Sequence, residues 1–267
     1  MIFREDVRWE TLKPQEFLAR QAACPVVYLP MGLCEPHGHV APFGLDTIKA
    51  DWLCDEAAHR FGGIVAPTMN YHVHETGYHA PWLEEVMGGV NPRLGALPPQ
   101  VVFQTLLYQL RAFRNAGFRG LVLISGHHGA QADLRRVVEA FSDAFGMAHF
   151  VRTDPELVAG RFTGDHAGRY ELSQLLAIRP DLVDLSRAGR VGTDPLGRFA
   201  QNPDVEEASA DEGTRILGAS LDRIGQAVSA LDLPDIPADA FLTLSDVDDL
   251  WDRFRVTQGD WVTLSAG

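Results

Sequence analysis

The segment from Gly32 to Asp46 places three potential metal ligands close together in the sequence. Glu35 and His37 are two residues apart, so in an extended segment their side chains point the same way. Asp46 comes just before a run of helical period, where a carboxylate can also serve as a helix cap. Taken alone, Asp46 would be interpreted as such a cap and Glu35 as a solvated loop residue.

Two further groups of polar residues lie later in the chain. His127 belongs to Ser125-Gly-His-His-Gly129, directly after the clearest strand-like run of the sequence. Glu171 follows Asp165 and shares a helical stripe with several leucines. A carboxylate on an apolar face is costly unless a cation neutralises it, so Glu171 is also a candidate ligand.

Together these carboxylates and imidazoles are ligands that Zn²⁺, Mn²⁺ and Fe²⁺ accept. A carboxylate such as Asp46 could bridge two ions, and a water held between them would be acidified to a hydroxide nucleophile. Scattered structural histidines would not be expected to concentrate in loops and junctions, yet eight of the ten do: His37, His39, His72, His74, His79, His127, His128 and His166. The pattern therefore predicts a metal site.

The elements that must position these residues follow from the hydrophobic pattern. Short β-branched runs alternate with longer segments of helical period, which predicts a parallel sheet covered by helices on both faces. Strands are expected at 25–32, 64–71, 120–125 and 148–152, and helices at 50–61, 102–113, 134–145, 165–178 and 209–231. Long loops are expected at 72–97 and 184–205, and a proline-punctuated tail closes the chain.

Ligands collect at the carboxyl ends of parallel strands, so the groups around Glu35 and His127 should meet at one edge of the sheet. No repeat, low-complexity tract or linker is evident in the sequence. We therefore expect a single domain over residues 1–267, an α/β protein built as a three-layer α/β/α sandwich with a mostly parallel central sheet.

Composition excludes several classes of function. The 267 residues are 46% hydrophobic, enough for a large core, and the formal charge of −13 disfavours nucleic-acid binding. No apolar run approaches the roughly 20 residues of a membrane span, and no leader pattern opens the chain, so a cytoplasmic protein without membrane association is expected. The three cysteines are interpreted as reduced and mostly buried.

Three ordered segments resemble the motifs of the creatininase (creatinine amidohydrolase) family. Residues 30–39 with Asp46 resemble its motif of metal-binding Glu, His and Asp. Ser125-Gly-His-His-Gly129 resembles the Asn-Gly-His-Gly-Gly segment, whose His is a ligand. The segment 165–173, which contains Glu171, resembles the third motif.

The resemblance implies the fold of that family and a site for two divalent ions bridged by Asp46. The ions would be Zn²⁺ and/or Mn²⁺, with Fe²⁺ as a further candidate. Glu35 and His127 would complete one site, and His37 and Glu171 the other.

The same resemblance implies roles for two residues of the third motif. In creatininase a Glu two residues after the ligand His also binds metal, but this chain has Gly129 there, so Glu171 would take over. His166 would assist proton transfer to the leaving group. His166 and Glu171 are therefore the candidate catalytic residues.

The chain also departs from the family pattern around the expected pocket. Ser125 and Ala130 replace the flanking Asn residues, and a loop over residues 71–82 stands where the family has a Gly-Thr segment. We expect that metal chemistry is retained and substrate recognition changed. The candidate pocket residues are His72, His74, His79, Trp82 and His128. The alternative for all of them except His128 is that they belong to a surface loop stabilised by local hydrogen bonds, and the two interpretations have equal weight.

The function expected from the resemblance is hydrolysis of a C–N bond in a cyclic or small amide by a metal-bound hydroxide. The nearest alternative is ring opening of a cyclic polyol ketone, diketone or lactone at the same site. A non-enzymatic metal-binding α/β protein would instead close the coordination shell. A nucleotide-binding module would need a glycine-rich phosphate loop, which the segment after the first strand lacks. The expected partners are a small-molecule substrate and, by resemblance, further copies of the chain in a homo-oligomer, often a hexamer.

Overall fold

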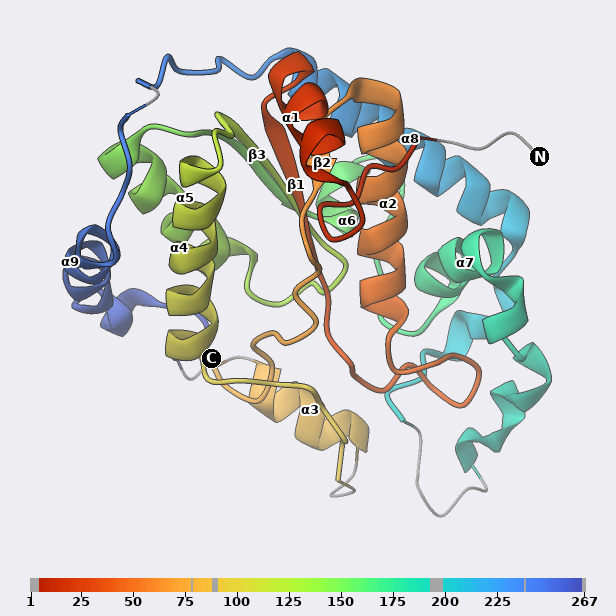
Figure 1. Cartoon of the computed structure of the whole chain (residues 1–267). Helices are drawn as coiled ribbons and strands as arrows, with labels where there is room; N and C mark the ends of the chain where they lie inside the picture. The colour runs from red at the N-terminus through yellow and green to blue at the C-terminus, as the bar shows by residue number, and fades with distance from the viewer. Residues whose placement is uncertain (1–4, 78, 88–90, 193–198, 238, 266–267) are drawn as a thin grey trace.

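The central sheet contains four parallel strands in the order β2-β1-β3-β4 (Figure 1). The computed structural model describes residues 5–77, 79–87, 91–192, 199–237 and 239–265. The strands are β1 (Val26–Met31), β2 (Ile64–Val65), β3 (Gly120–Ser125) and β4 (Ala148–Thr153). β1 pairs with β3 from Val26 opposite Gly120 to Met31 opposite Ser125, so both strands end at the same edge of the sheet.

Helices cover both faces of this sheet (Figure 1). One face carries α4 (Pro99–Asn115), α5 (Gln131–Phe145) and α9 (Leu244–Arg255), and the other carries α2 (Leu45–Phe61) and α8 (Ala210–Ser229). The remaining helices are α1 (Pro14–Ala23), α3 (His79–Met87), α6 (Asp154–Leu157) and α7 (Arg169–Ile178), with 3₁₀ turns η1 (Pro180–Leu182), η2 (Leu185–Gly192), η3 (Pro203–Glu207) and η4 (Gln258–Asp260).

The side chains of each central strand alternate between two cores, as strand geometry requires. Val27 and Leu29 pack with α4, α5 and α9, whereas Val26 and Tyr28 pack with α2 and α8. All six residues of β1 are buried, which is typical of a strand covered on both faces. The expected three-layer α/β/α sandwich with a parallel sheet is confirmed.

Several predicted elements have different bounds in the structure, and the helix expected at 50–61 begins earlier, at Leu45. The strand expected at 64–71 is only Ile64–Val65, since Pro67 has no N–H to donate to the ladder. The helix expected from Asp165 begins at Arg169, after Ala167 takes a φ of 50°. The Asp165 carboxylate accepts hydrogen bonds from backbone N–H groups at the start of this helix, so it acts as a cap outside the helix.

The two segments expected to be loops contain regular structure. α3 lies within 72–97 because Leu83, Val86 and Met87, at i, i+3 and i+4, pack against Phe199 and Ala200. Two 3₁₀ turns, η2 and η3, occupy parts of 184–205. Residues 78, 88–90 and 193–198 of these segments lie outside the described residues.

The tail also forms a helix that the sequence analysis did not predict. α9 buries Val247, Leu250, Trp251 and Phe254, which recur with helical spacing. The rings of Trp251 and Phe254 pack on Trp261, with centroids 6.0 and 5.3 Å away. Within the described part of the chain, no helix combines the length and apolar character needed to cross a bilayer.

Candidate metal centre

The candidate metal centre lies at the carboxyl edge of the sheet, where β1 and β3 end side by side. The loop after β1 carries Glu35 and His37, and the loop after β3 carries His127. Asp46 stands in the first turn of α2 and Glu171 in the first turn of α7. All five side chains are buried. The fold therefore brings together the five residues that the sequence singled out as ligands.

Two glycines allow the loop after β3 to approach the other ligands. A Cβ at Gly126 would lie 2.0 Å from the backbone oxygen of Asp46, so only glycine permits this contact. A Cβ at Gly129 would lie 2.5 Å from Nε2 of both His127 and His79. The His127 and His79 rings thus leave no room for a side chain at the position where the resemblance expects a glutamate.

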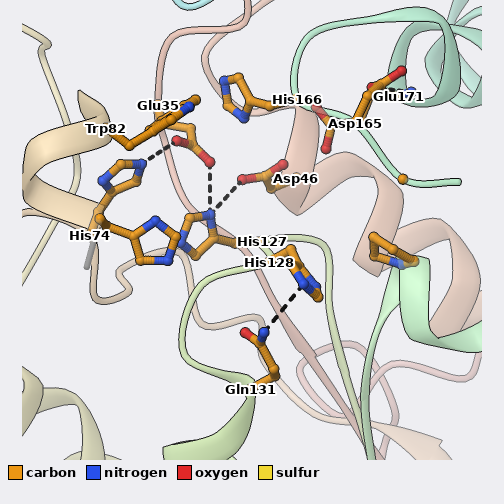
Figure 2. Close-up of a pocket in the computed structure, with 13 residues that line it drawn as sticks. Glu35, Asp46, His74, Trp82, His127, His128, Gln131, Asp165, His166 and Glu171 are labelled. Atoms are coloured by element: carbon orange, nitrogen blue, oxygen red, sulfur yellow. Dashed lines mark hydrogen bonds and ion pairs between the residues drawn. The ribbon is translucent and has the colours of Figure 1, made fainter. Parts of the chain in front are cut away.

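Glu35 lies between two imidazoles (Figure 2). Its Oε1 lies 2.8 Å from Nδ1 of His127, and its Oε2 lies 2.8 Å from Nε2 of His74. The Nδ1 of His127 is also 3.7 Å from Oδ2 of Asp46. On the far side of the His127 ring, Nε2 donates to the Val73 carbonyl at 3.2 Å, so a neutral ring turns its Nδ1 lone pair toward the carboxylates.

His37, Asp46 and Glu171 form a second group of potential ligands. The Nδ1 of His37 donates to the Glu35 carbonyl at 3.0 Å. Its Nε2 lies 3.2 Å from Oδ1 of Asp46 and 3.5 Å from Oε2 of Glu171. Among the described residues, neither this Nε2 nor Oδ2 of Asp46 has a hydrogen-bond partner. A nitrogen lone pair that faces carboxylate oxygens requires a cation between them, which is either a proton or a metal ion.

The electrostatics of both groups favour a bound cation. Burial opposes a charge on His37, but Asp46 and Glu171 outweigh it and raise its pKa to about 9. Burial likewise opposes a charge on His127, and Glu35 and Asp46 raise its pKa to about 10. A metal ion at either group therefore competes with a tightly held proton.

Lys49 is a buried cation of this centre that the sequence analysis missed. It follows Asp46 by one turn of α2, and its Nζ lies 2.6 Å from Oε1 of Glu171 and 3.2 Å from Oδ2 of Asp154. Burial raises the pKa of Glu171, but Lys49 is the strongest opposing influence and the pKa falls to about 2. A feature of the sequence could have identified Lys49 as buried. It is one of only two lysines in the chain, and it stands four residues before Leu53 on the apolar stripe of α2.

The two groups open on a pocket of ≈ 520 Å³, a size suited to a small molecule. Its lining residues are Glu35, Asp46, His74, His79, Trp82, His127, His128, Gln131, Pro155, Gly164, Asp165, His166 and Glu171 (Figure 2). None of these lining residues is a lysine or an arginine. The wall therefore presents carboxylates, imidazoles and one indole to a molecule that enters.

Four of the five residues expected at a substrate pocket line it: His74, His79, Trp82 and His128. The Nε2 of His79 lies 2.9 Å from the Gly129 carbonyl, which ties the loop after β2 to the loop after β3. His72 lies instead behind the pocket wall. It is fully buried, and its Nδ1 accepts a hydrogen bond from the Val73 N–H at 2.8 Å.

His166 lies against both the ligand residues and the pocket wall. Its ring stacks on His37 with centroids 4.7 Å apart and meets the edge of Trp82 at 5.0 Å. Burial lowers the pKa of His166, so the ring is neutral near pH 7. Its Nε2 donates to the Pro36 carbonyl at 2.9 Å, which leaves Nδ1 of the neutral ring as a proton acceptor.

The chain is similar to known proteins over most of its length. The family model described as "Creatininase: Creatinine amidohydrolase" matches residues 10–228. Creatinine amidohydrolase of Pseudomonas putida is 31% identical over 210 residues, which are 70% of this chain and 75% of the relative. The 3-dehydro-scyllo-inosose hydrolase of Thermotoga maritima is 26% identical over 204 residues, which are 72% of this chain and 61% of the relative.

Solved structures share the fold. A crystal structure of creatinine amidohydrolase superposes with a TM-score of 0.71 at 23% identity and covers 87% of this chain and 100% of its own. A creatininase structure described as "Mn" and a mutant creatininase described as "Zn-Zn type" each give a TM-score of 0.70, at 23% and 24% identity, over 86% of this chain and 100% of theirs.

Proposed function

The chain belongs to the creatininase family and is a metal-dependent hydrolase of the amidohydrolase type, and we propose that it cleaves a C–N bond in a cyclic or small amide with two divalent ions. One ion would be held by Glu35, His127 and Asp46, and the other by His37, Asp46 and Glu171. Zn²⁺ and Mn²⁺ suit this mixture of carboxylate and imidazole ligands, and they are the metals in the descriptions of two similar creatininase structures.

One observation supports this proposal: Nε2 of His37 and Nδ1 of His127 face buried carboxylate oxygens of Asp46 and Glu35 at 3.2 and 2.8 Å, which calls for a cation between each pair. Nε2 of His37 and Oδ2 of Asp46 are buried without hydrogen-bond partners among the described residues. Buried polar atoms in native proteins are nearly always satisfied, so these atoms fit a bound ion. When bound, the ions would acidify a water molecule and polarise the substrate carbonyl.

The residues of the chain supply the remaining functions. The backbone carbonyls of Val73 and Glu35 accept hydrogen bonds from the outer nitrogens of His127 and His37 and so orient the two ligand imidazoles. Lys49 holds Glu171 through one carboxylate oxygen so that the other faces His37. His166 accepts a proton at Nδ1 and delivers it to the leaving nitrogen. Its place between His37 and Trp82 lets it serve both the attacking water and the leaving group.

The pocket also favours an enzyme over a metal-storing protein. A structural metal site has a closed shell, whereas Glu35, Asp46, His127 and Glu171 all line a cavity that can admit a small molecule. The Thermotoga maritima relative supports a second candidate, ring opening of a cyclic polyol ketone, because attack on a ring ketone needs the same groups.

Metal analysis combined with a substrate screen tests the proposal. Purified protein should hold two divalent ions per chain and hydrolyse cyclic amides, and activity should vanish with chelator and return with Zn²⁺ or Mn²⁺. Turnover of cyclic polyol ketones alone would favour the second candidate. Amide hydrolysis that persists in chelator, with no metal bound, would contradict both.

The remaining expectations concern assembly and location. We propose that the chain acts on a small molecule as a cytoplasmic homo-oligomer, a hexamer by family resemblance. Light scattering on the purified protein measures the assembly state directly.

A further inference from the structure

His74 comes from the loop after β2, outside the three motifs that resemble the family. Its side chain is 1% exposed, and its Nε2 lies 2.8 Å from Oε2 of Glu35. The other carboxylate oxygen of Glu35 faces His127 at the same distance. His74, Glu35 and His127 offer ligand atoms that all lie within 4.8 Å of one another.

The fold leaves the second nitrogen of His74 without a partner. Nδ1 is buried and makes no hydrogen bond among the described residues, whereas the outer nitrogen of His127 is tied to the Val73 carbonyl. The two rings lie 5.2 Å apart with an angle of 30° between their planes. The His74 ring thus turns its Nε2 toward the Glu35 carboxylate, which is its only hydrogen-bond or ion-pair partner in the described part of the chain.

We propose that His74 is a direct metal ligand, which binds the same ion as Glu35 and His127. This inference rests on the proposed dinuclear site and enlarges it, because that ion would be held by Glu35, His74, His127 and the bridging Asp46. The other ion would keep three protein ligands, and it would be the one with more open positions for water or substrate.

The assignment has a consequence for the pocket wall. Trp82 lies 5.8 Å from the His74 ring and 5.0 Å from the His166 ring. An ion bound to His74 would thus fix the loop that leads into α3, the helix that presents Trp82 to the pocket, so metal binding would also position the surface that contacts substrate.

The alternative is that His74 only donates a hydrogen bond to Glu35. A glutamine distinguishes the two roles, because its amide N–H can replace the Nε2 donor, whereas an amide is a poor ligand for Zn²⁺. We therefore compare His74→Gln and His74→Ala by titration with Zn²⁺ against a chromophoric chelator. His149→Gln is the control, because His149 stands in β4 and is not among the residues that line the pocket.

If His74 is a ligand, both His74 variants lose about tenfold or more in affinity for one of the two ions, and the control keeps both affinities. Wild-type affinity in His74→Gln with weakened binding in His74→Ala would overturn the assignment, as would unchanged binding in both variants. Wild-type protein that binds no ions would contradict the proposed function itself, whereas wild-type affinity for both ions in every variant would contradict only the role of His74.

A measurement on the unmodified chain removes any dependence on variant folding. X-ray absorption of the wild-type protein loaded with two Zn²⁺ ions counts the imidazoles bound to zinc. We expect three imidazoles for every two ions, from His37, His74 and His127. A count of two would overturn the proposal.

Discussion

Replacing Lys49 with methionine removes the one fully buried ammonium group of the described residues from a cluster of carboxylates. Lys49 contacts Glu171 at 2.6 Å and Asp154 at 3.2 Å, and it lies 3.9 Å from Asp46. Methionine keeps the volume of the side chain and removes the charge. Two or three buried carboxylates are then left without their shared cation.

Breaking a buried ion pair by removal of one partner costs about 3–5 kcal/mol. For a chain of this size such a loss lowers the melting temperature by about 10 °C. A metal ion bound by His37, Asp46 and Glu171 would restore positive charge near the same carboxylates, so the loss should be smaller in the metal-loaded protein.

The assay is urea unfolding of wild-type and Lys49→Met protein, with excess chelator and with excess Zn²⁺. Lys13→Met is the matched control, because Lys13 is the other lysine of the chain and forms an exposed pair with Glu16 at 3.4 Å. Exposed pairs of this kind contribute about 0–1 kcal/mol. The double variant Lys49→Met with Asp154→Asn removes one unpaired carboxylate and should recover part of the loss.

A Lys49→Met protein that unfolds within about 1 kcal/mol of wild type in chelator would refute this reasoning. That result would mean that water reaches the carboxylates or that they take up protons at little cost.

Four further predictions concern the metal centre. Asp46→Asn should abolish activity and weaken both ions while circular dichroism shows an intact fold; full activity would remove the bridge. In chelator, the free energy of unfolding should fall as pH rises from about 7 to 10. The folded-state pKa values of His37 and His127, about 9 and about 10, exceed the ordinary 6.5, so the stabilisation from their protonated forms is lost as the pH passes through these values. A flat profile in urea titrations would contradict this. His166→Gln should lower kcat about 100-fold or more with little change in bound metal; equal loss of metal by elemental analysis would assign it to the ligands instead. Gly129→Ala should destabilise the protein by about 1–3 kcal/mol, since its Cβ meets two imidazoles at 2.5 Å; unchanged melting by calorimetry would show that the loop moves freely.

Much of the fold was accessible from local pattern. β1 and β3 are short continuous apolar runs, which is typical of buried parallel strands, and the apolar stripe of α2 repeats with the helical period of about 3.6 residues. The helix α9 was missed because it follows a proline-rich stretch and packs its apolar face against Trp261, just beyond its end, and against α4, which lies far earlier in the sequence. β2 was predicted too long because the apolar run continues past Pro67, where the ladder is interrupted.

The polar residues that follow the strands were recognisable from the sequence as candidate ligands. Glu35, His37 and His127 follow β1 and β3 directly, and parallel pairing places such residues at one edge of a sheet. Their approach to one another was therefore predictable from strand order, together with the carboxylate of Asp46 at the start of the next helix.

Only the tertiary structure decided which charges meet. Lys49 and Asp154 are 105 residues apart, and their pairing depends on how α2 packs against the end of β4. The contact of His74 with Glu35 depends on the path of an irregular loop, which has no periodicity to reveal it. Burial strengthens these contacts because it lowers the local dielectric constant. The burial of a side chain depends on the packing of the complete fold and cannot be derived from its neighbours in the sequence.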